Sequence, residues 1–256
     1  MKVVLLAGGF GTRISEESQF KPKPMIEIGG YPILWHIMKW YSHFGHNEFI
    51  ICGGYKQQVI KEFFANYYIY NSDVTFDFAN NGNITVHRNH AENWKVTVVD
   101  TGLKTLTGGR IKKIKKFLNP DELFLMTYGD GVSDVDINAS IEFHKKTGTL
   151  ATLTGVLPEG RFGVMDMKGN KISSFREKSK DDIGWINGGF MVLEPKVIDY
   201  IKEDVMFEHA PLEALANEGN LSCYKHYGFW QCMDTMRDKE KLEILLAENK
   251  APWKVW

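Results

Sequence analysis

The 256-residue sequence has little cysteine and no long apolar run, and both features exclude classes of protein. Its three cysteines, Cys52, Cys223 and Cys232, are an odd number without metal-site spacing, so we expect reduced thiols in a cytoplasmic protein, with Cys52 in the core. No segment approaches the roughly 18 consecutive apolar residues of a membrane-spanning helix. The apolar run Val3–Ala7 after Lys2 is shorter than the roughly 7–15 residues of a signal peptide's apolar region. The sequence therefore predicts no membrane partner.

An excess of positive charge is also missing. The chain has 31 lysines and arginines against 32 aspartates and glutamates, which gives a formal net charge of -1. A protein whose main partner is nucleic acid usually carries a strongly basic surface, so we expect no nucleic-acid partner. Any site that binds an anion must depend on a local group of cations.

What the sequence does contain is an alternation of strand and helix patterns. Val3–Ala7 is a continuous aliphatic run that ends in two glycines, which is typical of a parallel strand buried on both faces. Three segments continue the alternation: a helix that Pro32 opens and Gly45 closes, a strand over Phe49–Cys52 and a helix over Lys56–Ile69. This order predicts a parallel sheet with helices on its faces.

The alternation is interrupted once. Residues 74–108 contain short runs, among them VTFDF, ITVHR and KVTVVD, which predict an inserted antiparallel β segment. We expect one domain over residues 1–256, with a C-terminal helix and tail over 236–256. The remaining predictions are helices over Gly109–Phe117, Val135–His144 and Met236–Glu248, and strands over Leu123–Thr127, 150–156, 171–177, 186–193 and 221–226.

The loop after the first predicted strand reads GGFGTRISEESQFKPKP. Glycines after such a strand let backbone amides approach phosphate oxygens. The dinucleotide fingerprint GxGxxG fails here, because its third glycine position is Ile14, and no GxxxxGK[ST] is present. Both motifs also need a helix to start at once, whereas Pro22 and Pro24 predict an extended Lys21 and Lys23. The loop is a phosphate loop of another kind or an ordinary surface loop.

Three cations in this loop suit a triphosphate. Arg13 presents a planar fork to phosphate, and each lysine presents a point charge. The prolines restrict the backbone around Lys23 and lower the cost of ordering it when an anion binds. Spacing alone does not distinguish Lys21 from Lys23.

These residues support a family resemblance. GGFGTR followed by KPKPMIEIGGYPIL resembles the signature of sugar-1-phosphate nucleotidylyltransferases, and the likeness extends through YGDG at 128–131, INGG at 186–189 and GFWQCMDT at 228–235. It implies an α/β fold with a Rossmann-like, mixed and mostly parallel sheet flanked by helices. VTVVDTG and TGGR resemble the subfamily that acts on CTP and glucose 1-phosphate. The resemblance thus implies CDP-glucose and pyrophosphate as products, Mg²⁺ as cofactor, and a place in bacterial dideoxysugar and O-antigen synthesis.

Two carboxylates are candidates for the metal. Asp130 follows the predicted strand Leu123–Thr127, at the sheet edge where ligands of open α/β sheets gather, although Asp-Gly is also a common turn. Asp234 precedes the last predicted helix and could be its N-cap. Thr235 can take that role instead, with Asp238 three residues later completing a capping box. The resemblance implies that Asp130 and Asp234 bind Mg²⁺ together.

The resemblance also implies roles for the other site residues. Lys23 and Arg13 are expected to be catalytic, Lys23 at the α-phosphate and the sugar phosphate and Arg13 at the β and γ phosphates. In Glu177-Lys178-Ser179 the serine replaces the family's proline, which puts the local turn in doubt, and Gly188 with Gly189 could instead be a hairpin turn. The expected nucleotide contacts are Leu6, Ala7, Gly8, Gly9, Gly11, Thr12, Arg13, Thr105, Arg110 and Gly129, and the expected sugar-phosphate contacts are Lys23, Glu177, Lys178, Asn187 and Gly188.

Two alternatives stay open from the sequence. UTP or dTTP could replace CTP, and the chain could be a regulatory paralogue that binds a nucleotide sugar without catalysis. His36, His43 and His46 lack a metal-binding pattern and are interpreted as packing or surface residues. Trp253 and Trp256 are expected to pack against this chain or a neighbouring subunit, and we expect a homo-oligomer.

Overall fold

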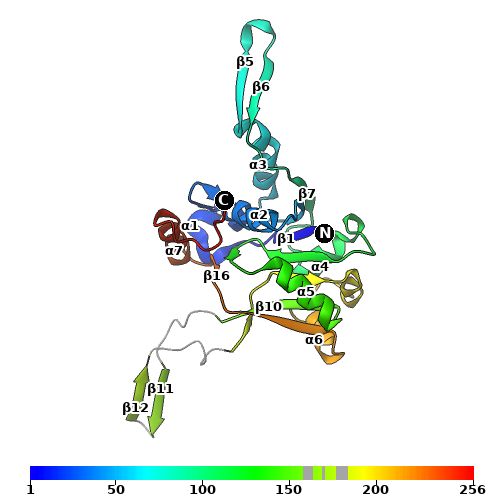
Figure 1. Ribbon diagram of the computed structural model, residues 1–256, viewed down its shortest axis with the longest axis vertical. Helices are drawn as coiled ribbons and strands as arrows, with labels where there is room; N and C mark the ends of the chain where they lie inside the picture. Colours follow the sequence, from blue (N-terminus) through cyan, green and yellow to red (C-terminus); the bar gives the residue numbers. More distant parts are fainter. Residues whose placement is uncertain (158–163, 169–170, 177–183) are drawn as a thin grey trace.

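A mixed, mostly parallel sheet forms the centre of the computed structural model, which describes residues 1–157, 164–168, 171–176 and 184–256 (Figure 1). Within these ranges the sheet is eight-stranded, in the order β13-β10-β14-β8-β1-β4-β7, with β15 paired to β10. Its four strands from β8 to β7 run parallel. The strands are β1 (Val3–Ala7), β4 (Glu48–Gly53), β7 (Lys95–Asp100), β8 (Phe124–Tyr128), β10 (Ala151–Val156), β13 (Ile186–Asn187), β14 (Met191–Leu193) and β15 (Leu221–His226).

Helices cover both faces of this sheet. The first strand is apolar on both of its faces, so each face must be buried against other elements. Val3, Leu5 and Ala7 belong to one buried cluster, and Val4 and Leu6 belong to the other, as the period of two of a strand requires. The predicted α/β class is confirmed. The helices are α1 (Ser15–Ser18), α2 (Ile33–His43), α3 (Gln57–Tyr70), α4 (Thr107–Lys113), α5 (Ile137–Thr147), α6 (Ala210–Asn217) and α7 (Met236–Ala247), with 3-10 helices at Thr12–Ile14, Lys23–Met25, Phe78–Asn80, Lys115–Phe117 and Pro195–Tyr200.

The prediction that all of 74–108 is an antiparallel insertion is wrong for β7. This strand pairs with β4 in parallel, Glu48 opposite Lys95 through Gly53 opposite Asp100, and is an edge of the central sheet. Val96 and Val98 pack on one buried cluster and Val99 on the other, so helices cover both faces of β7. Residue alternation indicates a strand but carries no information about the direction of its pairing. The parallel direction of β7 therefore could not be predicted from the residue pattern.

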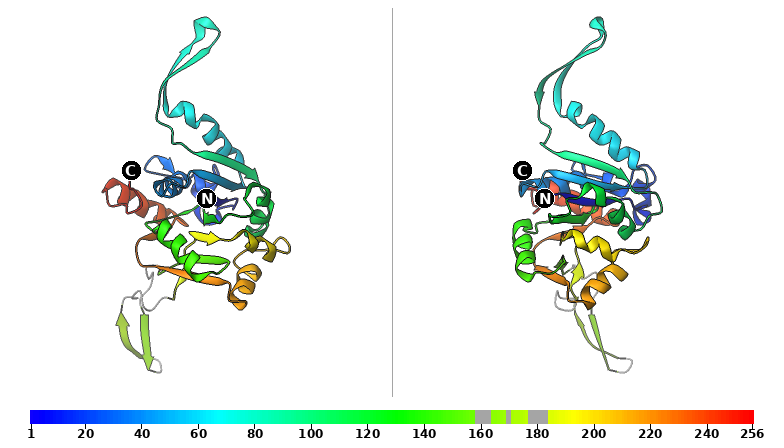
Figure 2. Two further views of the ribbon diagram at one scale, coloured as in Figure 1. Left: turned by 45° about the vertical axis from the view of Figure 1, so that its right-hand side comes forward. Right: turned by 90° about the vertical axis from the view of Figure 1, so that its right-hand side faces the viewer.

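The inserted segment itself is a hairpin. Strands β5 (Ser72–Asp77) and β6 (Asn83–Asn89) pair antiparallel and extend away from the sheet (Figures 1 and 2). A second pair, β11 (Val164–Lys168) and β12 (Lys171–Arg176), lies at the opposite end of the long axis in all views. Two further small ladders are formed by β2 (Glu27–Ile28) with β3 (Tyr31–Pro32), and by β9 (Gly131–Ser133) with β16 (Trp230–Cys232).

The predicted strand over 186–193 is interrupted. β13 and β14 pair with the two ends of β10 along one of its edges, while β15 pairs with the whole of β10 along the other. The interruption falls at Gly189 and Phe190, whose φ angles are 79° and 44°. Such angles lie in the left-handed region and break a regular strand.

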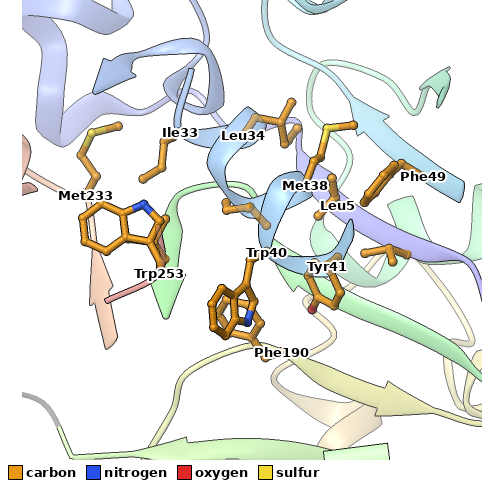
Figure 3. Close-up of a cluster of buried hydrophobic side chains, with 14 of the residues drawn as sticks. Leu5, Ile33, Leu34, Met38, Trp40, Tyr41, Phe49, Phe190, Met233 and Trp253 are labelled. Atoms are coloured by element: carbon orange, nitrogen blue, oxygen red, sulfur yellow. The ribbon is translucent and has the colours of Figure 1, made fainter. Parts of the chain in front are cut away.

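The buried core joins the C-terminus to the first half of the chain. Trp253 is fully buried in the cluster drawn in Figure 3. It stacks on Phe229, and its indole N–H donates to His36. Tyr41 stacks on Phe190, and the Trp40 indole donates to the Val135 carbonyl. Packing of Trp253 within its own chain is therefore confirmed, and Cys52 is buried as expected. No helix among the described residues is long and apolar enough to cross a membrane.

Candidate active site

A cavity of about 390 Å³ opens at the carboxyl ends of β1, β7 and β8. This is the edge where open α/β sheets bind ligands, and the volume is within the usual range of ligand pockets. Its walls come from segments that are distant in the sequence but follow neighbouring parallel strands. The lining comprises Leu6–Arg13, Lys23, Pro24, Leu103–Thr107, Arg110, Tyr128, Asp130, Met206 and Asp234.

The glycine loop forms one wall. Gly11 has a φ of 65°, a conformation that favours glycine, and the 3-10 helix Thr12–Ile14 begins directly after it. Ile14 is fully buried, and the Ser18 hydroxyl donates to the Gly11 carbonyl at 2.9 Å. The expectation that no helix follows the glycines is therefore wrong, since this 3-10 helix and α1 follow at once. Buried Ile14 anchors this turn although the third fingerprint glycine is absent.

The prediction of an extended Lys23, made from the following Pro24, is also wrong. It begins the 3-10 helix Lys23–Met25, in which the Met25 amide donates to Pro22 and the Ile26 amide donates to Lys23. A proline in the first turn of a helix is tolerated because its missing N–H has no partner to lose there, and this outweighs the preference that Pro24 imposes on Lys23. Pro22 remains extended, with φ -67° and ψ 149°.

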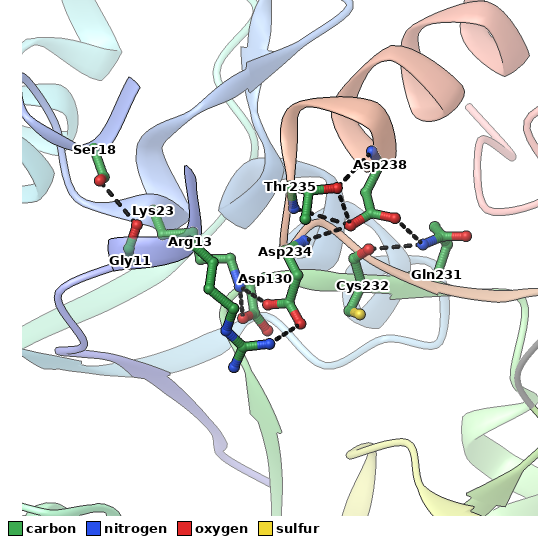
Figure 4. Close-up of polar contacts among 10 residues, drawn as sticks. All are labelled: Gly11, Arg13, Ser18, Lys23, Asp130, Gln231, Cys232, Asp234, Thr235 and Asp238. Atoms are coloured by element: carbon green, nitrogen blue, oxygen red, sulfur yellow. Dashed lines mark hydrogen bonds and ion pairs between the residues drawn. The ribbon is translucent and has the colours of Figure 1, made fainter. Parts of the chain in front are cut away.

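The two lysines that spacing could not separate have different surroundings. The ammonium of Lys21 donates to Glu27 at 2.9 Å, outside the cavity lining. The ammonium of Lys23 lies at the cavity and donates to Asp130 and Asp234, at 2.5 Å in each case. Figure 4 shows this cluster, with Arg13 completing it through a 2.7 Å bond to Asp234.

A small antiparallel ladder brings the two carboxylates together. Cys232 in β16 lies opposite Gly131 in β9, and the Met233 amide donates to the Asp130 carbonyl at 2.8 Å. This backbone pairing therefore brings Asp130 and Asp234 together, although they are 104 positions apart in the chain. Thr235 caps α7, and the predicted capping box between Thr235 and Asp238 is confirmed.

Charge and burial at the Lys23 ammonium act in opposite directions. Its side chain is 12% exposed, and this burial lowers its pKa. The charges of Asp130 and Asp234 and their hydrogen bonds raise it by more, so the pKa of Lys23 lies above its usual value and the ammonium stays charged. Arg13 has a side chain that is 75% exposed, so its guanidinium is accessible to an anion that enters from solvent.

Asp130 and Asp234 fit a divalent cation. One oxygen of each lies 2.5 Å from the same nitrogen, so a single cation at this place can contact both. Mg²⁺ usually takes one or two protein carboxylates and completes its shell with phosphate oxygens and water. No group of three or more candidate metal ligands occurs among the described residues. The pair thus suits a metal that is shared with a phosphate substrate.

The structure places most of the expected nucleotide contacts in the lining. Gly129 is an exception: its amide donates to the Leu6 carbonyl, and a Cβ there would lie 3.0 Å from Pro24, so glycine permits close packing behind Lys23. Asn187 does not line the cavity but donates to the Tyr128 hydroxyl at 3.1 Å, and the Gly188 carbonyl accepts from Trp230. Glu177 and Lys178 lie outside the described residues.

Sequence reasoning missed several lining residues. Tyr128 ends β8 directly before Gly129 and Asp130, so the strand-end position was a usable signal. Its hydroxyl donates to Glu208 at 2.7 Å. The wall over Leu103–Thr107 follows β7, and assigning β7 to an insertion concealed that its end belongs to the site. The missed lining residues are Phe10, Pro24, Leu103, Lys104, Leu106, Thr107, Tyr128 and Met206.

The α/β fold and a cation-lined cavity at the carboxyl ends of its strands are typical of enzymes that transfer nucleotidyl groups. The family model described as nucleotidyl transferase matches residues 2–231, and the chain belongs to that family.

Individual relatives narrow the comparison. The chain is 56% identical to a glucose-1-phosphate cytidylyltransferase of Salmonella typhimurium and 43% identical to a probable one of Bacillus subtilis, with 100% of both chains covered in each case. Among solved structures, it is similar to HddC from Yersinia pseudotuberculosis, with a TM-score of 0.69 and 25% identity over 96% of this chain and 99% of that one.

Proposed function

We propose that the protein transfers CMP from CTP to glucose 1-phosphate, giving CDP-glucose and pyrophosphate. The observation that carries the chemistry is the Lys23 ammonium held between Asp130 and Asp234 at the edge of the cavity. The choice of substrates is supported by full-length relatives at 56% identity that carry the name glucose-1-phosphate cytidylyltransferase.

This reaction does not need a general base. The nucleophile is an oxygen of the sugar phosphate, which is largely ionised at pH 7 because its second pKa is about 6. It forms a bond to the α-phosphorus of CTP, and the bond from that phosphorus to the bridging oxygen breaks, so pyrophosphate leaves with the electron pair. The protein must align two polyanions and neutralise charge on the oxygens around the phosphorus.

The cations of the glycine loop supply that neutralisation. We assign Lys23 to the α-phosphate and the incoming sugar phosphate, because it is the less exposed of the two and is fixed by two carboxylates. We assign Arg13 to the β and γ phosphates, since its exposed fork can bind two oxygens. The amides of the glycine loop, from Gly8 to Thr12, contribute further donors to the triphosphate.

Asp130 and Asp234 would hold Mg²⁺. When bound, the metal would supply positive charge near the phosphates of the two substrates. The same two carboxylates contact Lys23, so its ammonium lies beside the place proposed for the reacting phosphates.

The sugar side of the site is expected next to Tyr128. Asn187 and Gly188 lie there, beside β10, and we assign them with Glu177 and Lys178 to glucose 1-phosphate. Thr105 and Arg110 are assigned to the wall that faces the nucleotide. A cytoplasmic location suits the proposal, because it gives access to CTP.

The test is pyrophosphate release from CTP, UTP, dTTP, GTP and ATP, each incubated separately with glucose 1-phosphate and Mg²⁺. We expect release with CTP and loss of release on adding EDTA. Release with UTP or dTTP but not with CTP would refute the proposed substrate. If none of the triphosphates gives pyrophosphate, the result would favour a regulatory protein that binds a nucleotide sugar without catalysis.

We also propose that the chain forms a homo-oligomer. The support is the extended hairpin, on which Phe76 and Phe78 stack on each other and are 48% and 85% exposed. Exposed apolar groups of this kind often mark an interface. Light scattering after gel filtration should give a mass above the 29.3 kDa of one chain, and Phe76→Ser with Phe78→Ser should lower it. A monomeric wild-type mass would contradict this.

A further inference from the structure

Trp230 joins two parts of the site that the proposed reaction needs at a fixed distance. It begins β16, the strand that leads to Asp234, and its indole N–H donates to the Gly188 carbonyl at 2.8 Å. Gly188 directly follows Asn187, which ends β13 on the side of the site assigned to the sugar. The indole is half-buried and packs against a buried apolar cluster.

The position of Trp230 is fixed by the same ladder that places the two carboxylates. In this ladder Trp230 lies opposite Ser133. The Ser133 hydroxyl also donates to the Phe229 carbonyl at 2.7 Å, directly before Trp230. A shift of Trp230 along the strand would therefore also disturb the register that holds Asp130 beside Asp234.

Gly188 is tied to the central sheet as well as to this ladder. Its amide donates to the Thr154 carbonyl in β10 at 2.8 Å, and its carbonyl accepts from Trp230. A Cβ at Gly188 would lie 2.7 Å from Val156, so a side chain there would push this segment away from β10. One peptide segment thus connects the sheet with the strand that leads to the carboxylate pair.

The side chain of Asn187 connects this segment to the cavity. Its Nδ2 donates to the hydroxyl of Tyr128, a lining residue, at 3.1 Å, and its Oδ1 accepts from the Gly189 amide at 3.0 Å. Among the described residues, these bonds use one of the two N–H donors and one of the two acceptor positions of the amide. Sugar hydroxyls both donate and accept, so the remaining donor and acceptor suit a sugar better than a phosphate.

We propose that Trp230 is a positioning residue for the hexose phosphate, which fixes Asn187 and Gly188 relative to the carboxylate pair. It acts through the Gly188 carbonyl. The hexose must present its phosphate in line with the bond that breaks, so a displaced binding segment weakens hexose binding and leaves nucleotide binding intact. This inference rests on the proposed nucleotidyl transfer and specifies how the second substrate is held.

The experiment separates the N–H group of Trp230 from its apolar area. Trp230→Phe keeps an aromatic six-membered ring and removes the N–H. Trp230→His removes the benzene ring but keeps a five-membered ring, whose Nε2–H can be placed where the indole N–H lies. For each variant, kcat and both KM values are measured with CTP and glucose 1-phosphate at about pH 8, where histidine is neutral. Tm is recorded to register structural damage.

Trp94→Phe is the matched control. The Trp94 indole is also half-buried and packs against the same apolar cluster. Its N–H donates to the Ser42 hydroxyl at 3.1 Å, away from the cavity lining. The control therefore removes the same chemical group from a comparable environment, and both of its KM values should match the wild type.

We expect Trp230→Phe to raise KM for glucose 1-phosphate about tenfold, the usual effect of leaving a hydrogen-bond partner unpaired, and to leave KM for CTP unchanged. Trp230→His should keep KM for glucose 1-phosphate closer to the wild type, although it loses more apolar area and so lowers Tm further. Opposite orders of the two variants in KM and in Tm indicate positioning, because loss of stability alone would make the histidine variant worse in both.

An unchanged KM for glucose 1-phosphate in Trp230→Phe would overturn the inference, and so would an equal rise of both KM values. A larger KM for glucose 1-phosphate in Trp230→His than in Trp230→Phe would show that apolar area matters and the N–H does not. If Trp230→Phe does not fold, Trp230→His decides: a KM near the wild type supports the inference, and a tenfold rise refutes it.

Failure of the proposed function gives a different result. If the wild type uses another triphosphate or another hexose 1-phosphate, the proposed substrates are wrong, and the same comparison with the pair that it uses still tests Trp230. If the wild type turns over no pair, the proposed reaction fails. Dissociation constants of glucose 1-phosphate and CTP from calorimetry then replace the KM values, with the same expected and contradicting results.

Discussion

At the scale of single residues, the site depends on which lysine of the KPKP segment enters the cavity. Lys23 contacts both carboxylates, whereas Lys21 pairs with Glu27 outside the lining. The spacing of the two is identical relative to their prolines, so only the tertiary structure distinguishes them. The turn at Lys23–Met25 directs the side chain of Lys23 to Asp130.

Lys23→Ala should lower kcat by orders of magnitude, because the ammonium is assigned to the oxygens of the phosphorus under attack. Lys21→Ala is the matched control from the same segment and should keep kcat near the wild-type value. Steady-state kinetics with CTP and glucose 1-phosphate measures both, and circular dichroism checks that each variant is folded. Near-normal turnover of Lys23→Ala would remove this residue from the mechanism.

Asp130→Asn should raise the Mg²⁺ concentration required for half-maximal activity, because one of two charged ligands becomes neutral. A titration of activity with Mg²⁺ measures the change. Asp134→Asn is a control for a nearby carboxylate, since Asp134 bonds to His226 and Phe229 and not to Lys23. An unchanged requirement in Asp130→Asn would show that the metal binds elsewhere.

His36 should make stability depend on pH. Burial lowers the pKa of His36 to about 4, and its neutral ring is held between the Trp253 N–H and the Ile28 carbonyl. The unfolded chain takes up the proton at about pH 6.5, so stability is complete above that pH and falls as the pH drops toward 4. The loss is about 3 kcal/mol when complete.

Thermal unfolding between pH 7 and pH 4 measures this loss. His36→Gln should show a smaller decrease over this range than the wild type. His43→Gln, which changes an exposed histidine of the same helix, should follow the wild type. Identical slopes for wild type and His36→Gln would contradict the assignment.

At the scale of elements, α7 holds the second carboxylate in place. Its capping box spans Thr235 and Asp238, and the Asp238 carboxylate also accepts from the Asp234 amide at 3.1 Å. Thr235→Val should cost about 1 kcal/mol of stability, the usual value of an N-cap. It should also lower activity, since Asp234 directly precedes the cap. Thr235→Ser should retain both, and chemical denaturation with kinetics separates the two effects.

The elements show where sequence reasoning works and where it stops. The cap at Thr235 was predictable because it is local, and so was the helix after it. The direction of β7 was not, because it depends on pairing with β4, which is 47 residues earlier in the chain at the start of each strand. The turn at Lys23 was predicted wrongly, since the local preference before Pro24 was weighed without the hydrogen bonds that the folded turn supplies.

At the scale of the whole molecule, the family resemblance identified one part of the site, and the order of the strands in the sheet revealed the other. The motifs indicated the glycine loop, Lys23, Asp130 and Asp234, which the fold brings to one cavity. Tyr128 was overlooked although it begins the YGDG motif. Leu103 and Leu106 belong to no motif that we recognised, because apolar lining residues have no fixed spacing. They become visible only when the strand order places β7 beside β4.

A competition among triphosphates is the sharpest test of the proposed specificity for CTP. The protein is given an equimolar mixture of CTP, UTP, dTTP, GTP and ATP with glucose 1-phosphate and Mg²⁺, and the nucleotide sugars formed early are identified by mass spectrometry. The product ratios then equal the ratios of kcat/KM, free of differences between separate assays. We predict CDP-glucose as the main product, absent with Lys23→Ala at the same enzyme concentration. A different nucleotide sugar as the main product would contradict the account.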